Sequence, residues 1–154
     1  MKAIVAVHGR FHGFELAAGL YGKGLLQKLL TTYPKVVVNH LIGYNLPIIS
    51  IPELEIYRRF SQAFLRGKSD LLIAREFGEF VRKKVKKCEG KGVLIGWSSA
   101  TLEAIKPAHD LGKKVIIERG SSHIVEQMEI LKLAYTEFGM HFSPSGPEMI
   151  EREE

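Results

Sequence analysis

The chain has 154 residues, of which 45% are hydrophobic, and a formal net charge of +5. This length and composition are typical of one globular domain and do not favour a disordered chain. A single cysteine, Cys88, excludes an internal disulfide and a thiolate zinc site. No eighteen apolar residues follow one another, which excludes a membrane-spanning helix, and the apolar run 3–7 is too short for a signal peptide. We therefore expect a cytoplasmic protein.

Strand and helix patterns alternate along the chain, which predicts a parallel sheet covered by helices. The predicted strands span residues 3–7, 35–39, 47–50, 93–96 and 114–118, and the predicted helices span 14–30, 53–66, 70–88, 99–111 and 123–138, with a short acidic helix at the end. Pro34 is expected to close the first helix, because proline cannot continue one. Ser98 or Ser99 is the expected cap of the helix that ends before Gly112. The sequence thus predicts a single Rossmann-like domain over residues 1–154, a three-layer α/β sandwich with a mostly parallel sheet.

One strong strand signal leads directly into a polar turn. Val115, Ile116 and Ile117 form a β-branched run with a basic flank, which predicts a central parallel strand buried on both faces. The next six residues bring two charges, a glycine, two hydroxyls and an imidazole to the carboxyl end of that strand: Glu118, Arg119, Gly120, Ser121, Ser122 and His123. Ligands bind at this end of the strands in open α/β sheets, so these residues are candidates for a binding site.

Positive charge is concentrated in the middle of the chain. Between Arg58 and Lys91 the sequence has eleven Lys/Arg and four Asp/Glu. The densest part, Arg82–Lys87, shares a predicted helix with apolar residues at helical spacing, so the simplest interpretation is a solvated basic face. The alternative is peripheral contact with an anionic membrane at the inner membrane surface. Aromatic residues do not alternate with these charges as base-stacking platforms require, so we expect no nucleic-acid partner.

Several motifs that would identify a chemistry are incomplete. Gly67-Lys68-Ser69 resembles the end of a phosphate-binding loop, but Gln62 stands where that loop needs a glycine. The turn Gly9–Gly13 lacks the G-x-G-x-x-G spacing, and the sequence has no H-E-x-x-H and no D-x-D. His8 and His12 lie four residues apart across a turn, which disfavours a shared metal ion. We expect no resident metal or cofactor.

The segment Gly96-Trp97-Ser98-Ser99-Ala100 lies between a strand and a helix, where hydrolases place a nucleophilic serine in G-x-S-x-G. A small serine hydrolase with Ser98 as nucleophile is therefore one hypothesis, with Asp110 and His123 following in hydrolase order. Against it, Asp110 lies on the helix directly after the serine, whereas the acid of a triad should emerge from a later strand. Trp97 is expected to pack in the core or, alternatively, to wall a sugar pocket by stacking.

Three segments together resemble the N-terminal half of a family 4 glycosyltransferase of the GT-B fold: residues 8–17, 96–100 and 118–123. The resemblance covers nearly the whole chain and rests on the ordered set of segments. Such enzymes have two Rossmann-like domains that face a cleft, with the acceptor bound mainly by the first and the sugar nucleotide by the second. The resemblance implies that this chain is the acceptor-side domain of a retaining transferase, which moves a sugar from a nucleotide-sugar donor to an acceptor.

The resemblance also implies roles for individual residues. The catalytic residue would be His123, either as a hydrogen-bonding partner of the transferred sugar or by polarisation near the reacting centre, and not as a nucleophile. Gly9 would let the backbone approach the ligand closely, and Arg10 would supply a charged fork to a phosphate. The other substrate-binding residues would be Phe11, His12, Trp97, Ser98, Ser99, Glu118, Arg119, Gly120, Ser121 and Ser122, with Ser121 or Ser122 also capping the following helix.

The glutamate-rich donor motif of that family belongs to the second domain, which is not part of the sequence. We therefore expect the chain to be inactive without a donor-binding C-terminal Rossmann-like domain. That domain, the nucleotide-sugar and the acceptor are the expected partners. A non-catalytic binding module is the remaining alternative, and an exposed apolar face would make the chain a homo-oligomer.

Overall fold

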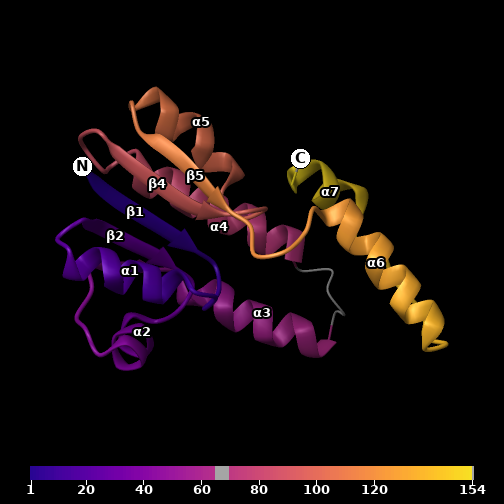
Figure 1. Ribbon diagram of the computed structural model, residues 1–154. Helices are drawn as coiled ribbons and strands as arrows, with labels where there is room; N and C mark the ends of the chain where they lie inside the picture. The colour runs from indigo at the N-terminus through magenta and orange to yellow at the C-terminus, as the bar shows by residue number, and fades with distance from the viewer. Residues whose placement is uncertain (65–69, 154) are drawn as a thin grey trace. The chain divides into compact units, whose positions relative to one another are not determined.

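The computed structural model of the chain describes residues 1–64 and 70–153 (Figure 1). The chain divides into two compact units, Met1–Glu118 and Arg119–Glu154. All five strands of the described residues belong to the first unit, and the second unit contains two helices.

The first unit is built on an all-parallel sheet with the strand order β3-β2-β1-β4-β5. The strands are β1 (Lys2–Val7), β2 (Leu26–Thr31), β3 (Ile48–Ser50), β4 (Gly92–Trp97) and β5 (Lys114–Glu118). The chain moves from β1 to β2 and β3, and then crosses to β4 on the other side of β1. This reversal between β1 and β4 marks the place where open α/β sheets bind ligands, beyond the carboxyl ends of the strands. The predicted Rossmann-like α/β fold is confirmed.

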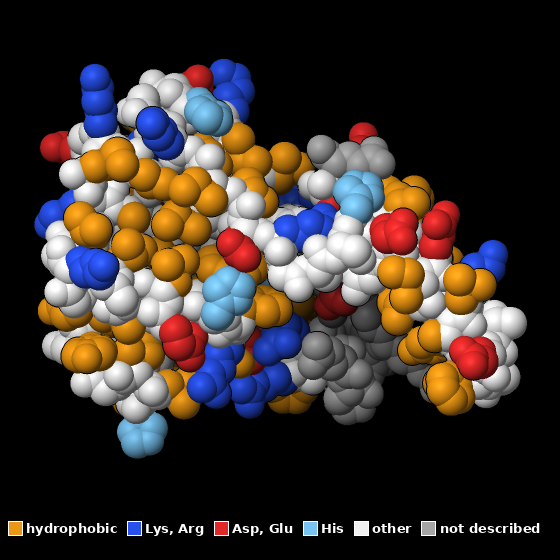
Figure 2. Space-filling view, in the orientation of Figure 1, with side chains coloured by type: hydrophobic (Ala, Val, Ile, Leu, Met, Phe, Trp, Pro, Cys, Tyr) orange, Lys and Arg blue, Asp and Glu red, His pale blue; other side chains and the backbone are white. Residues whose placement is uncertain are grey.

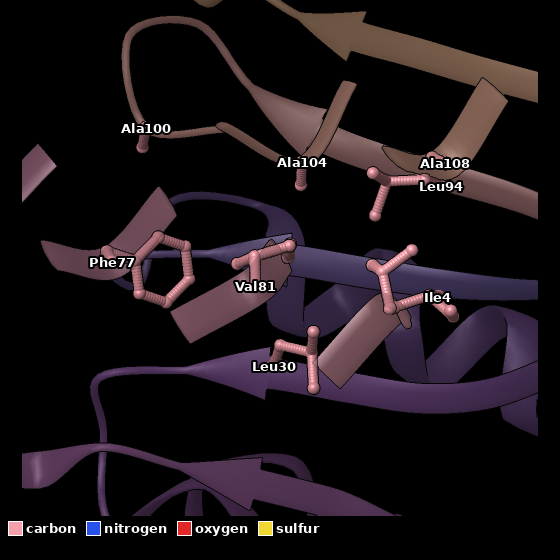
Figure 3. Close-up of a cluster of buried hydrophobic side chains, with 10 residues drawn as sticks. Ile4, Leu30, Phe77, Val81, Leu94, Ala100, Ala104 and Ala108 are labelled. Atoms are coloured by element: carbon pink, nitrogen blue, oxygen red, sulfur yellow. The ribbon is translucent and has the colours of Figure 1, made fainter. Parts of the chain in front are cut away.

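Helices cover both faces of this sheet. On one face, α1 (Gly13–Gly22) and α2 (Lys35–Ile42) pack over a core that includes Val5, Val7 and Leu29. On the other face, α4 (Asp70–Val85) and α5 (Leu102–Asp110) cover a second core (Figure 3). The labelled members of this second core are Ile4, Leu30, Phe77, Val81, Leu94, Ala100, Ala104 and Ala108. Strand β1 serves both cores because successive side chains of a strand point to opposite faces.

Two predicted elements in the first third of the chain are wrong. The predicted helix 14–30 ends at Gly22, and Leu26–Thr31 is strand β2 inside the sheet. The chain turns at Gly24, whose φ is 68°, and the leucines of β2 fit a helical period as well as a buried strand. The predicted strand 35–39 is helix α2, and Pro34 precedes this helix instead of closing the one before it. Proline is well tolerated there because the first turn of a helix leaves its N–H groups unbonded.

Strand β5 lies at the edge of the five-stranded sheet, whereas its β-branched run predicts a central strand. In the sheet it is hydrogen-bonded to β4 alone, and Ile116 is 50% exposed. Hydrophobic side chains gather on the surface over the part of the molecule where β4 and β5 lie (Figure 2). A β-branched run favours an extended backbone, but the number of neighbouring strands depends on the rest of the chain.

The start of α5 also differs from the prediction. Its N-cap residue is Thr101, and neither Ser98 nor Ser99 occupies that position. The Thr101 hydroxyl donates a hydrogen bond to the carbonyl of Trp97 at 3.0 Å and so closes the turn between β4 and α5. The C-terminal glycine is confirmed, since Gly112 has a φ of 68° and its N–H donates to the carbonyl of His109 at 2.8 Å. The remaining helix of the first unit, α3 (Pro52–Phe64), agrees with its predicted position.

The second unit consists of α6 (Ile124–Glu137) and α7 (Pro147–Glu153), as predicted for the end of the chain. An ion pair joins Nη1 of Arg119 to Oε2 of Glu153 at 2.6 Å, and the rings of Tyr135 and Phe142 meet edge to face with centroids 5.7 Å apart. In both units, no helix within the described residues is long and apolar enough to cross a membrane.

Candidate functional site

Two loops of the first unit hold backbone conformations that side chains rarely adopt. Phe11, in the loop between β1 and α1, has a φ of 33°, and Ser99, in the loop between β4 and α5, has a φ of 64°. They are the only non-glycine residues with a positive φ in the described parts of the chain. Such conformations cost about 1–3 kcal/mol each and cluster at functional sites. Both loops follow the strands that flank the reversal in strand order, so the strain coincides with the expected ligand-binding edge.

A histidine and a carboxylate meet between these loops. Nε2 of His12 lies 3.5 Å from Oε1 of Glu118, and the two side chains are 56% and 40% exposed. Glu118 is the last residue of β5 and stands opposite Trp97 of β4 in the sheet register. Its carbonyl accepts a hydrogen bond from the N–H of Ser98 at 2.9 Å. The structure therefore brings together predicted site residues from the ends of β1, β4 and β5.

Small residues make this close approach possible. A Cβ on Gly13, at the start of α1, would lie 2.9 Å from Cγ1 of Val7 and 3.1 Å from the Trp97 ring. A Cβ on Gly96 would lie 2.7 Å from Cβ of the buried Thr101. Both positions therefore need glycine for the loops to pack against the strand ends. Gly9 lies under the ring of Phe11, and its predicted approach to a ligand phosphate stays a prediction.

Trp97 forms the base of the site. It is 4% exposed, and its ring centroid lies 5.2 Å from that of His12 at an interplanar angle of 57°. Its Nε1 is buried and has no hydrogen-bond partner among the described residues. The packing role predicted for Trp97 is what the structure shows, while stacking of Trp97 on a sugar stays a prediction. Arg10, in the same loop as His12, is exposed.

A second cluster lies beside this site, and sequence reasoning missed it. Glu55 of α3 is buried and accepts hydrogen bonds from Nη2 of Arg58 at 2.7 Å and Nε of Arg59 at 3.0 Å. The hydroxyl of Thr32, after β2, donates to the carbonyl of His8, after β1, at 2.8 Å. It also lies 3.5 Å from Oε2 of Glu55. The spacing of Glu55, Arg58 and Arg59 fits ion pairs within a helix, which is the signal that could have found them.

Burial sets the protonation of His8 in this second cluster, and the two arginines set that of Glu55. Desolvation, followed by the positive charge of Arg58, lowers the pKa of His8 from 6.5 to about 4, so His8 is neutral near pH 7. The His8 ring contacts those of Phe11 and Phe77, with centroids 5.8 Å and 6.0 Å away. Burial acts to raise the pKa of the Glu55 carboxyl, but the hydrogen bonds from Arg58 and Arg59 outweigh it and hold the pKa below 4.5.

The remaining predicted site residues belong to the second unit. Nε of Arg119 donates a hydrogen bond to the carbonyl of Ser122 at 2.9 Å. The exposed His123 is the N-cap of α6, where its Nδ1 accepts from the N–H of Val125 at 3.4 Å. The predicted capping by Ser121 or Ser122 is therefore wrong, because the imidazole fills that role. The contacts of His123 and of the exposed Gly120 with a ligand stay predictions.

The incomplete motifs gain no support. Gly67-Lys68-Ser69 lies outside the described residues. Within the described ranges, no three His, Cys, Asp or Glu side chains are grouped so that they could hold a metal ion. Asp110, the acid of the hydrolase hypothesis, pairs with Lys106 at 3.2 Å near the end of α5, which leads back toward the amino ends of the strands. Glu118 is joined to Ser98 by a backbone hydrogen bond of 2.9 Å, and His12 lies against the ring of the neighbouring Trp97.

Comparisons of the chain with protein-family models, with curated proteins and with solved structures gave no match. The function is therefore inferred from the geometry of the site and from the three segments that resemble glycosyltransferases.

Proposed function

We propose that the chain is the acceptor-side domain of a retaining glycosyltransferase that moves a sugar from a nucleotide-sugar donor to an acceptor. The observation that carries the proposal is the pair of strained loops at the reversal in strand order, where His12 and Glu118 meet. A site at this edge of a Rossmann-like sheet is suited to a small polar ligand. The choice of sugar transfer among such functions rests on the resemblance of segments 8–17, 96–100 and 118–123.

The residues of the site have distinct tasks in this proposal. Glu118 and the ring of Trp97 hold the His12 imidazole in place, and His12 binds a hydroxyl of the acceptor. Arg10 is exposed in the same loop and binds a phosphate group. The role predicted for His123, a hydrogen bond to the transferred sugar, is kept as part of the proposal. Ser98 and Ser99 line the floor between the loops.

The proposal includes partners that complete the enzyme. A C-terminal Rossmann-like domain binds the nucleotide-sugar, and the chain alone binds the acceptor without turnover. The enzyme works in the cytoplasm, with peripheral contact at the inner membrane surface through Arg82–Lys87. In α4 and the turn after it, Lys83, Lys86 and Lys87 are exposed, which supports a cationic surface there.

The test is to join the chain to a donor-binding domain and to measure sugar transfer. We expect His12→Gln and Glu118→Gln each to lower turnover by about tenfold or more, because both reduce the positioning of the acceptor. The predicted catalytic residue is tested in the same enzyme by His123→Ala. Asp110→Asn is the matched control, because Asp110 is a comparably exposed carboxylate outside the site. Unchanged transfer in the His12 and Glu118 variants would contradict the proposal, and unchanged transfer in His123→Ala would remove His123 from it.

A serine hydrolase is a second candidate that one observation favours. Hydrolases hold their nucleophile on a strained turn between a strand and a helix, and Ser99, the residue after the predicted nucleophile Ser98, has a φ of 64° in such a turn. The pair of His12 and Glu118 would supply the base and its orienting acid. A fluorophosphonate probe separates the candidates: labelling that Ser98→Ala or Ser99→Ala abolishes would support hydrolysis, and the absence of labelling would exclude an activated serine. Stabilisation by an acceptor sugar without transfer in the joined enzyme would instead indicate a binding module.

A further inference from the structure

Helix α3 buries a carboxylate and exposes three large apolar side chains. Glu55 and Ser61 are buried, with exposed fractions of 4% and 2%. On the opposite side of the helix, Ile56 is 57% exposed, Tyr57 39% and Phe60 65%. Surface helices of globular proteins show the reverse arrangement, with the apolar stripe toward the core. The outer face of α3, defined here as Ile56, Tyr57 and Phe60, therefore needs an explanation.

The contacts of α3 with the rest of the first unit explain why Glu55 is buried, but not why the other side of the helix is apolar. Glu55 points inward because it accepts hydrogen bonds from Arg58 and Arg59 and lies beside Thr32 at the end of β2. Nothing in these contacts requires large apolar residues on the other side of the helix. Two of the three, Ile56 and Phe60, are one helical turn apart and so form a continuous stripe. Exposed apolar surface of this kind marks contact with a membrane or another molecule.

The charge of the first unit indicates the chemistry of the partner. Residues 1–118 contain 19 Lys/Arg and 10 Asp/Glu, a net charge of +9, whereas residues 119–154 contain three and seven, a net charge of −4. On α4, which contacts α3, Arg75 and Lys83 are exposed, and Lys86 is exposed just after its end. An anionic membrane fits both features, because its hydrocarbon interior accepts apolar side chains and its headgroups attract cations.

We propose that the outer face of α3 docks on an anionic membrane, with Ile56, Tyr57 and Phe60 inserted among the lipids and the cations of the first unit bound to the headgroups. Aromatic side chains favour this interfacial zone, where Tyr57 keeps its hydroxyl in contact with water. Docking through α3 does not depend on sugar transfer. It adds an apolar anchor to the purely electrostatic contact expected from Arg82–Lys87.

The experiment uses the full chain and vesicles of defined composition. Cosedimentation with phosphatidylcholine/phosphatidylglycerol vesicles should show binding that weakens with added salt, and pure phosphatidylcholine vesicles should bind much less. The double variant Ile56→Ser, Phe60→Ser should lose about tenfold or more of this binding, because it removes most of the inserted apolar area. Val36→Ser is the matched control, since Val36 is an exposed apolar side chain on α2. The control should bind like the wild type.

Two further variants make the result specific. Phe60→Trp places an indole on the outer face, and its emission should shift to the blue with anionic vesicles over a constant background from the buried Trp97. Lys83→Glu with Lys86→Glu should weaken binding several-fold through the electrostatic part. The proposal is overturned if the wild type does not bind anionic vesicles, or if the double serine variant binds as well as the wild type. A wild-type dimer that the double serine variant dissociates, without vesicle binding, would make this face an interface between copies.

Discussion

Two histidines of the loop after β1, His8 and His12, lie in opposite environments, although they are only four positions apart in the sequence. His8 contacts the rings of Phe11 and Phe77, and burial of its imidazole keeps it neutral near pH 7. His12 is exposed and lies 3.5 Å from the carboxylate of Glu118. One loop thus supplies a residue to a closed cluster and another to an open one.

The two clusters differ in what they can do: the closed one stabilises the fold, and the open one is available to bind a ligand. The closed cluster of His8, Thr32, Glu55 and the two arginines satisfies most of its polar groups internally, so a ligand has little to bind there. The open pair of His12 and Glu118 has exposed polar atoms and lies next to a strained backbone. Stability should therefore depend on the first cluster and ligand binding on the second.

The largest effect is expected from the pH dependence of His8. Its pKa is 6.5 in the unfolded chain and about 4 in the folded one, so between these values the unfolded state holds a proton that the folded state lacks. Stability should consequently fall as the pH drops through this window, by about 3 kcal/mol in all. His8→Leu should flatten the dependence of stability on pH, because it removes the imidazole that titrates. The substitution breaks no hydrogen bond of Nδ1, which has no partner among the described residues.

Urea unfolding at a series of pH values between about 7 and about 5 measures this effect, since little of the Glu55 titration falls in that range. Val36→Ser, which removes no titratable group and alters an exposed side chain, is the control and should keep the wild-type slope. An equal slope in His8→Leu and the wild type would show that His8 is not the buried neutral group of the closed cluster.

The next effect compares two ion pairs of the same geometry. Glu55–Arg58 and Glu79–Arg82 are both three residues apart with a shortest contact of 2.7 Å, but the carboxylates are 5% and 40% exposed. Glu55→Ala should cost about 2 kcal/mol because it leaves Arg58 without its buried acceptor. Glu79→Ala should leave the unfolding midpoint unchanged within error, since solvent replaces an exposed carboxylate. Equal losses in the two variants would show that burial does not distinguish these pairs.

The stability of the Glu55 variant should also respond to acid. The pKa of Glu55 lies below 4.5 in the folded chain, so the charged carboxylate stabilises the fold above that pH. This contribution should decline as the pH falls below about 4.5 and should be missing from Glu55→Ala at every pH.

The contrast between the clusters also shows how far the sequence predicts the fold and the site. Alternation of strand and helix patterns predicts the Rossmann-like architecture, and the rule that ligands bind at strand ends predicts that residues after β1, β4 and β5 meet. His12, Trp97 and Glu118 meet for this reason. The closed cluster was missed because Glu55 and Thr32 become neighbours only through tertiary packing, which no local pattern records.

The wrong elements have a similar cause. The leucines of Leu26–Thr31 satisfy a helical period and a buried strand equally well, and only the place of β2 inside the sheet decides between them. The β-branched residues of Lys35–Ile42 favour a strand, but this segment follows Pro34 and lies over one face of the sheet as a helix. Tertiary context overrides propensity in both cases.

The smallest effect on stability is expected from the pair of His12 and Glu118. Both side chains are exposed, so a double-mutant cycle of His12→Gln and Glu118→Gln should give a coupling free energy of unfolding of about 0.5 kcal/mol or less. The same two substitutions should impair acceptor use in the joined enzyme, because the pair orients a hydrogen-bonding group toward the ligand. A coupling of several times this size would mean that the pair ties the loop after β1 to the end of β5. A change in loop geometry, and not the loss of a ligand contact, would then explain any loss of transfer in these variants. His12, like His8, would be a structural residue.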